Sequence, residues 1–207
     1  MLEFYIARHG QTKWNTEGRL QGWLNSPLTQ KGIESAKLLG EHIQDVDFDV
    51  CYSSPSERAY HTLEIAISNR EMKVFKDERL MEMGLGIWQG KKSDEIQREY
   101  SDTYRAYFDS PATFYLEGAE TYHDLKQRVC SFIDEVIHKH FTETAHKKIL
   151  VITHGVTLMM MRLIFNGGEL EALSEYGVSE NAKLHIYQYD GKSFKSIIED
   201  EGNKMAR

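Results

Sequence analysis

Apolar and polar residues follow two different periods along this chain. Short continuous apolar runs predict buried strands, whereas apolar residues spaced three and four positions apart predict amphipathic helices. The predicted strands cover residues about 4–7, 48–53, 74–75, 148–153, 184–189 and 193–198. The predicted helices cover residues about 29–43, 54–68, 93–109, 121–141 and 156–166. Strands and helices are therefore expected to alternate through most of the chain.

Residues at the segment ends indicate where several of these elements begin and stop. Thr29 is a suitable N-cap for its helix, and Pro55 suits the first turn of the next one. Gly167-Gly168 ends the last helix, and Asp190-Gly191 joins the last two strands into a hairpin. Because strands alternate with helices, we expect an α/β fold with a mostly parallel sheet and helices on both faces. The hairpin makes the sheet mixed at one edge, and residues after Asp200 are expected to fray.

Composition narrows the class of protein. With 207 residues, of which 41% are hydrophobic and 28% charged, the chain fits one domain with one substantial core. The formal net charge of −7 provides no basic surface, so neither nucleic acid nor a membrane is expected as a partner. No apolar run approaches the roughly 18 residues of a membrane span, and the first strand begins too early for a signal peptide. Cys51 and Cys130 form no disulfide or metal-site pattern, which favours a cytoplasmic location.

Three of the predicted strands end in polar residues that are typical of anion sites. The first strand stops at Arg8-His9-Gly10, and the strand over 148–153 stops at His154-Gly155. The strand over 48–53 leads into a helix that carries Arg58 one turn from its start. If these strands are parallel, all three ends lie at one sheet edge, where helix N-termini add partial positive charge. Two arginines and two histidines at such an edge predict a pocket for a phosphate dianion.

These residue types together favour phosphoryl transfer through a phosphohistidine. In that scheme the His9 imidazole attacks phosphorus. Arg8, Arg58 and His154 hold the phosphoryl oxygens. Glu82 protonates the leaving alcohol and later takes a proton from water. Taken singly, Arg58 also fits a solvated helix residue, His154 a buried hydrogen-bonded histidine and Glu82 a loop carboxylate.

Several short motifs follow one another in a characteristic order from about residue 3 to 165. They are Arg8-His9-Gly10-x-Thr12-x-x-Asn15, Gln21-Gly22-Trp23, Leu28-Thr29-x-x-Gly32, Ser53-Ser54-Pro55-x-x-Arg58-Ala59-x-x-Thr62, Glu82-Met83-Gly84-Leu85-Gly86-x-Trp88-x-Gly90 and Thr153-His154-Gly155. The Arg-His-Gly triplet alone is a weak signal, but the ordered set is specific. The set resembles the histidine phosphatase superfamily, which includes the cofactor-dependent phosphoglycerate mutases.

The resemblance implies a role for each candidate residue. It implies that His9 is the phosphorylated nucleophile and that Glu82 is the general acid and base. Arg8, Arg58 and His154 are implied to form the phosphate pocket. The further phosphate or substrate contacts are Asn15, Gln21, Gly22 and Gly155. The implied chemistry uses neither a metal ion nor an organic cofactor.

The resemblance also implies a fold and a branch of the family. The fold is a three-layer α/β/α sandwich, built as a single domain over 1–207 with a small helical cap inserted at about 91–145. Mutases of this type carry a longer, more basic insertion after the Glu, so the chain looks like the phosphatase branch. That branch includes broad-specificity and alpha-ribazole phosphatases, which implies a small-molecule phosphomonoester as the substrate. A phosphoglycerate mutase and a catalytically silent phosphate-binding domain are the alternatives, and a homodimer is one option for the oligomeric state.

The predicted cap is rich in aromatic side chains, which either cover the leaving group or pack the cap helices together. These residues are Tyr104, Tyr107, Phe108, Phe114 and Tyr115. Glu120 is interpreted mainly as an acidic residue near a helix start. Met159-Met160-Met161 is interpreted as core rather than as a wall of the substrate pocket.

Overall fold

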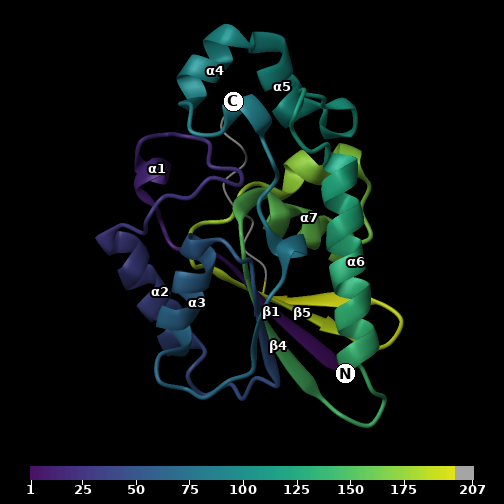
Figure 1. The fold of residues 1–207 in the computed structure, drawn as a ribbon. Helices are drawn as coiled ribbons and strands as arrows, with labels where there is room; N and C mark the ends of the chain where they lie inside the picture. The colour runs from purple at the N-terminus through teal and green to yellow at the C-terminus, as the bar shows by residue number, and fades with distance from the viewer. Residues whose placement is uncertain (199–207) are drawn as a thin grey trace.

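The structure is a computed structural model that describes residues 1–198. The predicted fraying after Asp200 therefore lies outside the described residues. One sheet organises the fold (Figure 1). Across residues 1–198 this sheet has six strands in the order β3-β2-β4-β1-β5-β6. The strands are β1 Leu2–Arg8, β2 Val50–Ser53, β3 Val74–Lys76, β4 Lys147–Thr153, β5 Leu184–Tyr189 and β6 Phe194–Ile198.

Most of the sheet is parallel, and only the closing hairpin is antiparallel. β4 pairs in parallel with both β1 and β2, and β2 pairs in parallel with β3. β5 runs antiparallel to β1, and β6 runs antiparallel to β5. The prediction of a mostly parallel, mixed sheet is confirmed. The register pairs Arg8 with Thr153, so β1 and β4 end at the same edge.

Helices cover both faces of the sheet (Figure 1). They are α2 Gln30–His42 and α3 Glu57–Ile67 on one face, and α6 Tyr122–His140 and α7 Gly155–Phe165 on the other. Alternate residues of β1 point to the two faces, as the pleat of a strand requires. Phe4 and Ile6 belong to the core under α6 and α7, whereas Tyr5 and Ala7 belong to the core under α2 and α3. The three-layer α/β/α sandwich is confirmed.

Helix α7 is buried along almost its whole length. Met159, Met160 and Met161 are at most 1% exposed, which confirms them as core residues. A helix with so many buried apolar residues fits its position, where it packs against β1 of the sheet, α6 and η4. Among residues 1–198, no helix combines the length and the apolarity that crossing a bilayer requires.

Two short helices form a cap above the ends of the parallel strands (Figure 1). They are α4 Ser93–Glu99 and α5 Ser101–Asp109. The prediction of one helix over 93–109 is wrong, because the backbone at Tyr100 has φ −131° and ψ 43° and leaves the helical region. Trp88 is fully buried against the cap, with its ring centroid 6.1 Å from that of Tyr104.

Helix α6 belongs to the layer that covers the sheet rather than to the cap. The predicted insertion over about 91–145 included this helix. Val129, Phe132 and Val136 of α6 are buried in the same core as the sheet, and the Phe132 ring lies 5.3 Å from that of Tyr52 on β2. A 19-residue amphipathic helix buries its apolar face on the sheet, so the helices of the cap are α4 and α5.

Several element boundaries differ from the prediction. Helix α3 begins at Glu57, because Ser56 is extended (φ −62°, ψ 137°) and occupies the N-cap position. Pro55 thus precedes the helix instead of lying in its first turn. β2 begins at Val50 rather than at Phe48, and a short helix lies in the loop after β1. The short elements are α1 Lys13–Thr16, η1 Glu78–Leu80, η2 Gly86–Trp88, η3 Pro111–Thr113 and η4 Leu170–Tyr176.

Candidate active site

Three strand ends meet at the edge of the sheet that faces the cap. The His9 N–H donates to the Thr153 carbonyl at 2.9 Å, and the Ser54 N–H donates to the Ile152 carbonyl at 3.0 Å. These bonds extend the parallel ladders on both sides of β4 past the ends of β1 and β2. The residues that follow the three strands, His9, Ser54 and His154, are therefore neighbours, as the parallel arrangement predicts.

His9 is a buried imidazole with a defined tautomer. Its Nδ1 atom lies 2.7 Å from the carbonyl oxygen of Gly10. A carbonyl oxygen only accepts, so Nδ1 carries the proton and Nε2 carries the lone pair. Nε2 accepts a hydrogen bond from Arg58 Nε at 3.3 Å. Burial, and then the charges of Arg58 and Arg8, lower the pKa of His9 well below its usual 6.5, so the ring is neutral at neutral pH.

Arg58 is buried and fixes the loop that forms one wall of the site. Its two Nη atoms donate to the Leu24 carbonyl at 2.7 Å and to the Gly22 carbonyl at 2.8 Å. Burial lowers the pKa of Arg58 to about 10; the nearby Glu82 carboxylate raises it, and Arg8 lowers it further. The guanidinium therefore stays charged at neutral pH. It places a fixed positive charge against the His9 ring.

His154 is fully buried against His9. The two ring centroids are 5.1 Å apart, and the ring planes cross at 61°. Nε2 of His154 lies 2.8 Å from Ser54 Oγ and 3.1 Å from Ser56 Oγ. Burial, followed by the charge of Arg58, lowers the pKa of His154 well below its usual 6.5. Both histidines of the site are thus neutral near pH 7.

The Glu82 carboxylate lies at the N-terminus of α7. Oε1 accepts the Thr157 N–H at 3.2 Å, and Oε2 accepts the Val156 N–H at 3.3 Å. The Met83 N–H also donates to Oε1, at 3.0 Å. The first N–H groups of a helix lack intrahelical partners, and the positive end of the helix favours an anion. The carboxylate is therefore held beside Gly155, opposite Arg8 at the end of β1.

A cavity lies between the strand ends and the cap. Of the predicted site residues, those that line it are Arg8, His9, Asn15, Gln21, Gly22, Arg58, Glu82 and Gly155. His154 packs behind this lining, against His9. The other lining residues are Arg19, Leu20, Leu85, Tyr107, Phe108, Val156 and Val178. The cavity thus has a cationic part beside His9 and a largely apolar part beneath the cap. Within residues 1–198, no group of three or more His, Cys, Asp or Glu side chains could hold a metal ion.

The cap aromatics divide between the two roles that the sequence left open. Tyr107 and Phe108 line the cavity, and Tyr107 also packs against Trp88, with ring centroids 6.0 Å apart. Those that pack around Trp88 are Tyr104 and Phe114, with ring centroids at 6.1 and 5.8 Å from its own. Tyr115 is 71% exposed, so water rather than the cavity surrounds most of it.

Most of the buried side-chain polar atoms without a hydrogen-bond partner belong to this site. Among residues 1–198 those at the site are Arg8 Nε, Gln21 Oε1 and His154 Nδ1, and the fourth is Trp88 Nε1, in the aromatic cluster under the cap. Most buried polar groups in proteins are hydrogen-bonded, so such atoms need a physical reason. Arg8 is anchored through one Nη atom, which donates to the Ser179 carbonyl at 3.0 Å, while its Nε keeps a donor. An oxyanion bound between Arg8 and the two histidines would give Arg8 Nε the acceptor that it lacks.

Sequence reasoning missed two residues that hold the catalytic candidates. The Thr157 N–H binds Glu82, and Asn181 Nδ2 donates to the His9 carbonyl at 2.8 Å. Thr157 has a detectable signal, because it lies three residues after His154, where the predicted helix has unpaired N–H groups. Asn181 lies in the loop between η4 and β5, and no periodicity or motif marks it.

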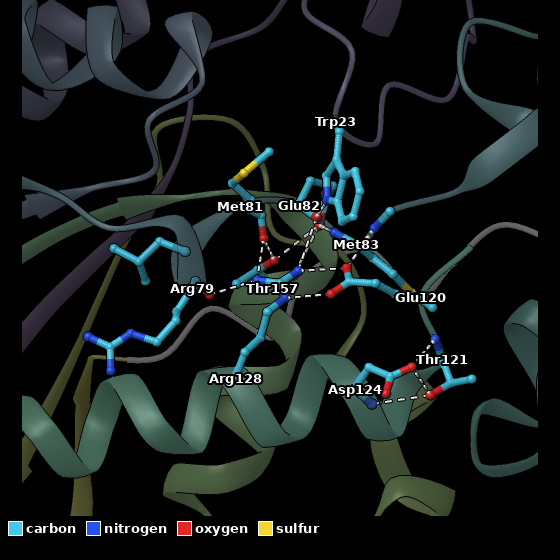
Figure 2. Close-up of polar contacts among 12 residues, drawn as sticks. Trp23, Arg79, Met81, Glu82, Met83, Glu120, Thr121, Asp124, Arg128 and Thr157 are labelled. Carbon is cyan, nitrogen blue, oxygen red and sulfur yellow. Dashed lines mark hydrogen bonds and ion pairs between the residues drawn. The ribbon is translucent and has the colours of Figure 1, made fainter. Parts of the chain in front are cut away.

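Glu120 contacts the segment that carries Glu82 rather than the cavity (Figure 2). Its Oε2 accepts the Gly84 N–H at 2.7 Å, and its carboxylate pairs with Arg128 at 2.8 Å. Arg128 in turn donates to the Glu82 carbonyl at 3.1 Å. Glu120 lies just before helix α6, where it was expected, but the sequence did not predict its pairing with Arg128.

Comparison with known proteins points to one family. The family model described as histidine phosphatase superfamily (branch 1) matches residues 4–198. Phosphoserine phosphatase 1 of Hydrogenobacter thermophilus is 32% identical over 187 residues, which cover 90% of this chain and 86% of that protein. The adenosylcobalamin/alpha-ribazole phosphatase of Escherichia coli is 31% identical over 182 residues, which cover 86% of each chain.

A solved structure agrees with this result. YhfR of Bacillus stearothermophilus superposes with a TM-score of 0.90 at 33% sequence identity, and the match covers 96% of each chain. The motifs in family order, the sandwich with its cap and the paired histidines at the strand ends lead to the same assignment. The chain belongs to the histidine phosphatase superfamily.

Proposed function

We propose that this protein hydrolyses small phosphomonoesters through a covalent phosphohistidine on His9. The observation that carries the proposal is the state of His9: Nδ1–H is anchored on the Gly10 carbonyl, and the unprotonated Nε2 meets Arg58. A neutral imidazole with its lone pair beside a fixed guanidinium suits attack on a phosphate dianion. The relatives that are named as phosphatases support hydrolysis as the outcome.

In the first half-reaction, His9 Nε2 attacks phosphorus in line with the leaving oxygen. The N–P bond forms while the P–O bond to the alcohol breaks, and Glu82 gives its proton to the departing oxygen. Arg58 and Arg8 stabilise the charge on the equatorial oxygens. The Gly10 carbonyl stabilises the positive charge that develops on the imidazole ring, because it accepts the Nδ1 proton.

In the second half-reaction, water attacks the phosphorus of phosphorylated His9. Glu82, ionised by the first half-reaction, takes a proton from that water, which replaces the proton that it gave to the leaving alcohol. The N–P bond breaks, and His9 returns to the neutral tautomer that Gly10 selects. Inorganic phosphate leaves through the cavity.

The remaining predicted contacts have geometries that suit substrate binding. Asn15 accepts the Thr12 N–H through Oδ1 at 3.0 Å, so the NH2 end of its amide is the one that can reach a phosphate. Gln21 brings a buried Oε1 to the cavity wall, and the His154 ring, whose buried Nδ1 has no hydrogen-bond partner, lies 5.1 Å from the His9 ring. Gly155 opens α7, where the helix N-terminus favours an anion.

We further propose that the reaction proceeds without a metal ion or an organic cofactor. Arg8 and Arg58 supply at the cavity the positive charge that phosphoryl transfer needs, and a histidine supplies the nucleophile. We also propose a cytoplasmic location, supported by the unpaired Cys51 and Cys130. The net charge of −7 supports a small molecule, rather than nucleic acid or a membrane, as the partner. A homodimer stays a proposal for the assembly.

The test is turnover of several phosphomonoesters in the presence of a chelator, with wild type compared with His9→Ala. We expect hydrolysis by wild type, a loss of more than about 10³-fold in the variant, and an acid-labile phosphoryl group on wild type alone. Full activity in the variant would overturn the proposal. An assay with 3-phosphoglycerate and bisphosphoglycerate belongs in the same set. Isomerisation well above hydrolysis would make the protein a mutase.

A further inference from the structure

The backbone around Glu82 is held by one side chain from a distant helix (Figure 2). Arg128 of α6 donates from Nη1 to the carbonyls of Arg79 at 2.6 Å and Met81 at 2.7 Å, and from Nη2 to the carbonyl of Glu82 at 3.1 Å. Three carbonyls within four residues thus share one guanidinium. Its side chain is only 17% exposed, so water competes weakly for these bonds.

Glu120 holds this guanidinium in place. Its two carboxylate oxygens accept from Arg128 Nε at 2.8 Å and from Nη2 at 2.9 Å, which is a bidentate pair. One of these oxygens also accepts the Gly84 N–H at 2.7 Å. The Arg128–Glu120 pair therefore binds the chain before and after Glu82. Arg128 binds the carbonyls up to that of Glu82, and Glu120 binds the Gly84 N–H.

The segment that carries Glu82 has little other regular structure to position it. It follows the short η1 element and precedes η2, and it joins no strand of the sheet. Two further side chains donate to its carbonyls: Trp23 Nε1 to that of Glu82 at 2.9 Å, and the Thr157 hydroxyl to that of Met81 at 2.7 Å. The Glu82 carboxylate also contacts the N–H groups of α7. These contacts hold its oxygens in one position only if the backbone of Glu82 is itself fixed.

We propose that Arg128, held by Glu120, is a positioning residue that sets Glu82 for proton transfer to the leaving oxygen. This proposal rests on the proposed function, because it assigns Glu82 the acid/base role. Proton transfer requires the acid within hydrogen-bond reach of the leaving oxygen, and a displacement of about 1 Å can cost 10²-fold in rate. His9 and Arg58 are held by other bonds, so attack on phosphorus stays intact without the Arg128 pair.

The proposal predicts a dependence on the leaving group. An alkyl phosphate releases a strongly basic alkoxide and needs the acid, whereas 4-nitrophenyl phosphate releases a stable phenolate and hardly needs it. Arg128→Met should lower kcat/KM for an alkyl phosphate by about 10²-fold, and that for 4-nitrophenyl phosphate by only a few-fold. A merely structural role of Arg128 would lower both values by the same factor.

Two further variants separate positioning from damage to the fold. Glu120→Gln keeps an acceptor for the Gly84 N–H but removes the charge that orients Arg128, so it should give the same selective loss to a smaller degree. Lys126→Met on the same helix breaks an exposed ion pair with Glu169 and should leave both rates unchanged.

A Glu82→Gln background gives the decisive comparison. If Arg128 acts through Glu82, adding Arg128→Met to Glu82→Gln should cause no further loss with the alkyl phosphate. Equal losses with both substrates, or a further 10²-fold loss in the Glu82→Gln background, would overturn the positioning role. Failure of the proposed function would look different, because His9→Ala would then leave turnover of both substrates unaffected.

Discussion

Arg58 Nε donates across 3.3 Å to Nε2 of His9, the nitrogen that we propose accepts the phosphoryl group. Both side chains are almost fully buried, at 1% and 2% exposure. The charge of Arg58 lowers the pKa of His9 and so keeps its lone pair available. In the proposed mechanism, the same N–H would donate to a phosphoryl oxygen once Nε2 is bonded to phosphorus. We therefore propose that one arginine serves the nucleophile before the reaction and the phosphoryl group during it.

Replacing Arg58 should affect both of these roles. Arg58→Met removes a preorganised donor and cation, so we expect kcat/KM to fall by about 10²–10³-fold. The pKa of His9 should rise, because one of the charges that lowers it is gone. NMR titration of the histidine ring, alongside the rate measurement, checks both effects. An unchanged His9 pKa with a reduced rate would contradict the electrostatic link between the two residues.

The buried histidines predict a pH dependence of stability. Folding lowers the pKa of His9 and of His154 well below 6.5, whereas the unfolded chain keeps values near 6.5. Below that pH the unfolded chain binds protons that the folded protein does not, so the free energy of unfolding falls as the pH falls. Their stabilising contribution is complete above about pH 6.5 and is lost progressively below it. Each histidine contributes a slope of at most about 1.4 kcal/mol per pH unit.

Urea unfolding between about pH 7.5 and 5.5 measures this slope. His154→Asn should reduce the slope by the contribution of one histidine. Identical slopes in the variant and wild type would show that His154 does not cause this pH dependence. The acid limb of kcat/KM is expected below pH 6.5 as well, because the free enzyme must carry a neutral His9.

Much of this site was predictable because its signals are local. The apolar run of β1 ends at Arg8 and His9, and the run of β4 ends at His154, so parallel pairing alone brings these residues together. The glycine after each histidine and the helix that follows β4 are visible in the same short windows. A polar residue at a strand end is a feature that sequence reasoning can place.

Residues that reach the site from far along the chain were not predictable in this way. Asn181 is 172 positions away from His9, whose carbonyl it binds, and Arg128 is 46 positions away from Glu82. Neither residue differs in its local pattern from a surface polar residue. The break between α4 and α5 at Tyr100 was not predictable either, because no glycine or proline marks it in the sequence. The Tyr100 ring packs 6.1 Å from the Trp88 ring, so tertiary packing overrides a continuous helical pattern there.

The aromatic cluster under the cap predicts a large and localised stability effect. Trp88 is fully buried, and the ring centroids of Tyr107 and Phe114 lie 6.0 and 5.8 Å from its own. Trp88→Ala should destabilise the protein by about 3–5 kcal/mol, the usual cost of such a cavity. Tyr115→Ala is the control: its side chain is 71% exposed, so we expect a change within about 0.5 kcal/mol. Chemical denaturation of both variants checks this, and equal effects would refute it.

Replacing Gly155 with alanine should reduce activity without unfolding the protein. A Cβ at this position would lie 3.6 Å from both Arg8 Nε and Glu82 Oε2, so a methyl group would stand between these two charged side chains. The same Cβ would lie 3.0 Å from Val178 Cγ1, which must shift by a few tenths of an ångström. Alanine suits a helix better than glycine, so Gly155→Ala should keep the stability of α7. We expect kcat/KM to fall by about 10–10²-fold.

Phosphate binding measured by calorimetry distinguishes a blocked cavity from a displaced helix in Gly155→Ala. A methyl group in the cavity should weaken binding of inorganic phosphate while the free energy of unfolding stays within about 0.5 kcal/mol of wild type. Gly167→Ala, just after the C-terminal end of α7, is a control for which we expect the opposite pattern. Gly167 has φ +67° and nothing within 4 Å of a Cβ, so alanine there should destabilise the protein by about 1 kcal/mol but leave phosphate binding unchanged. If Gly155→Ala bound phosphate as tightly as wild type, the anion would not bind against Arg8 beside Gly155.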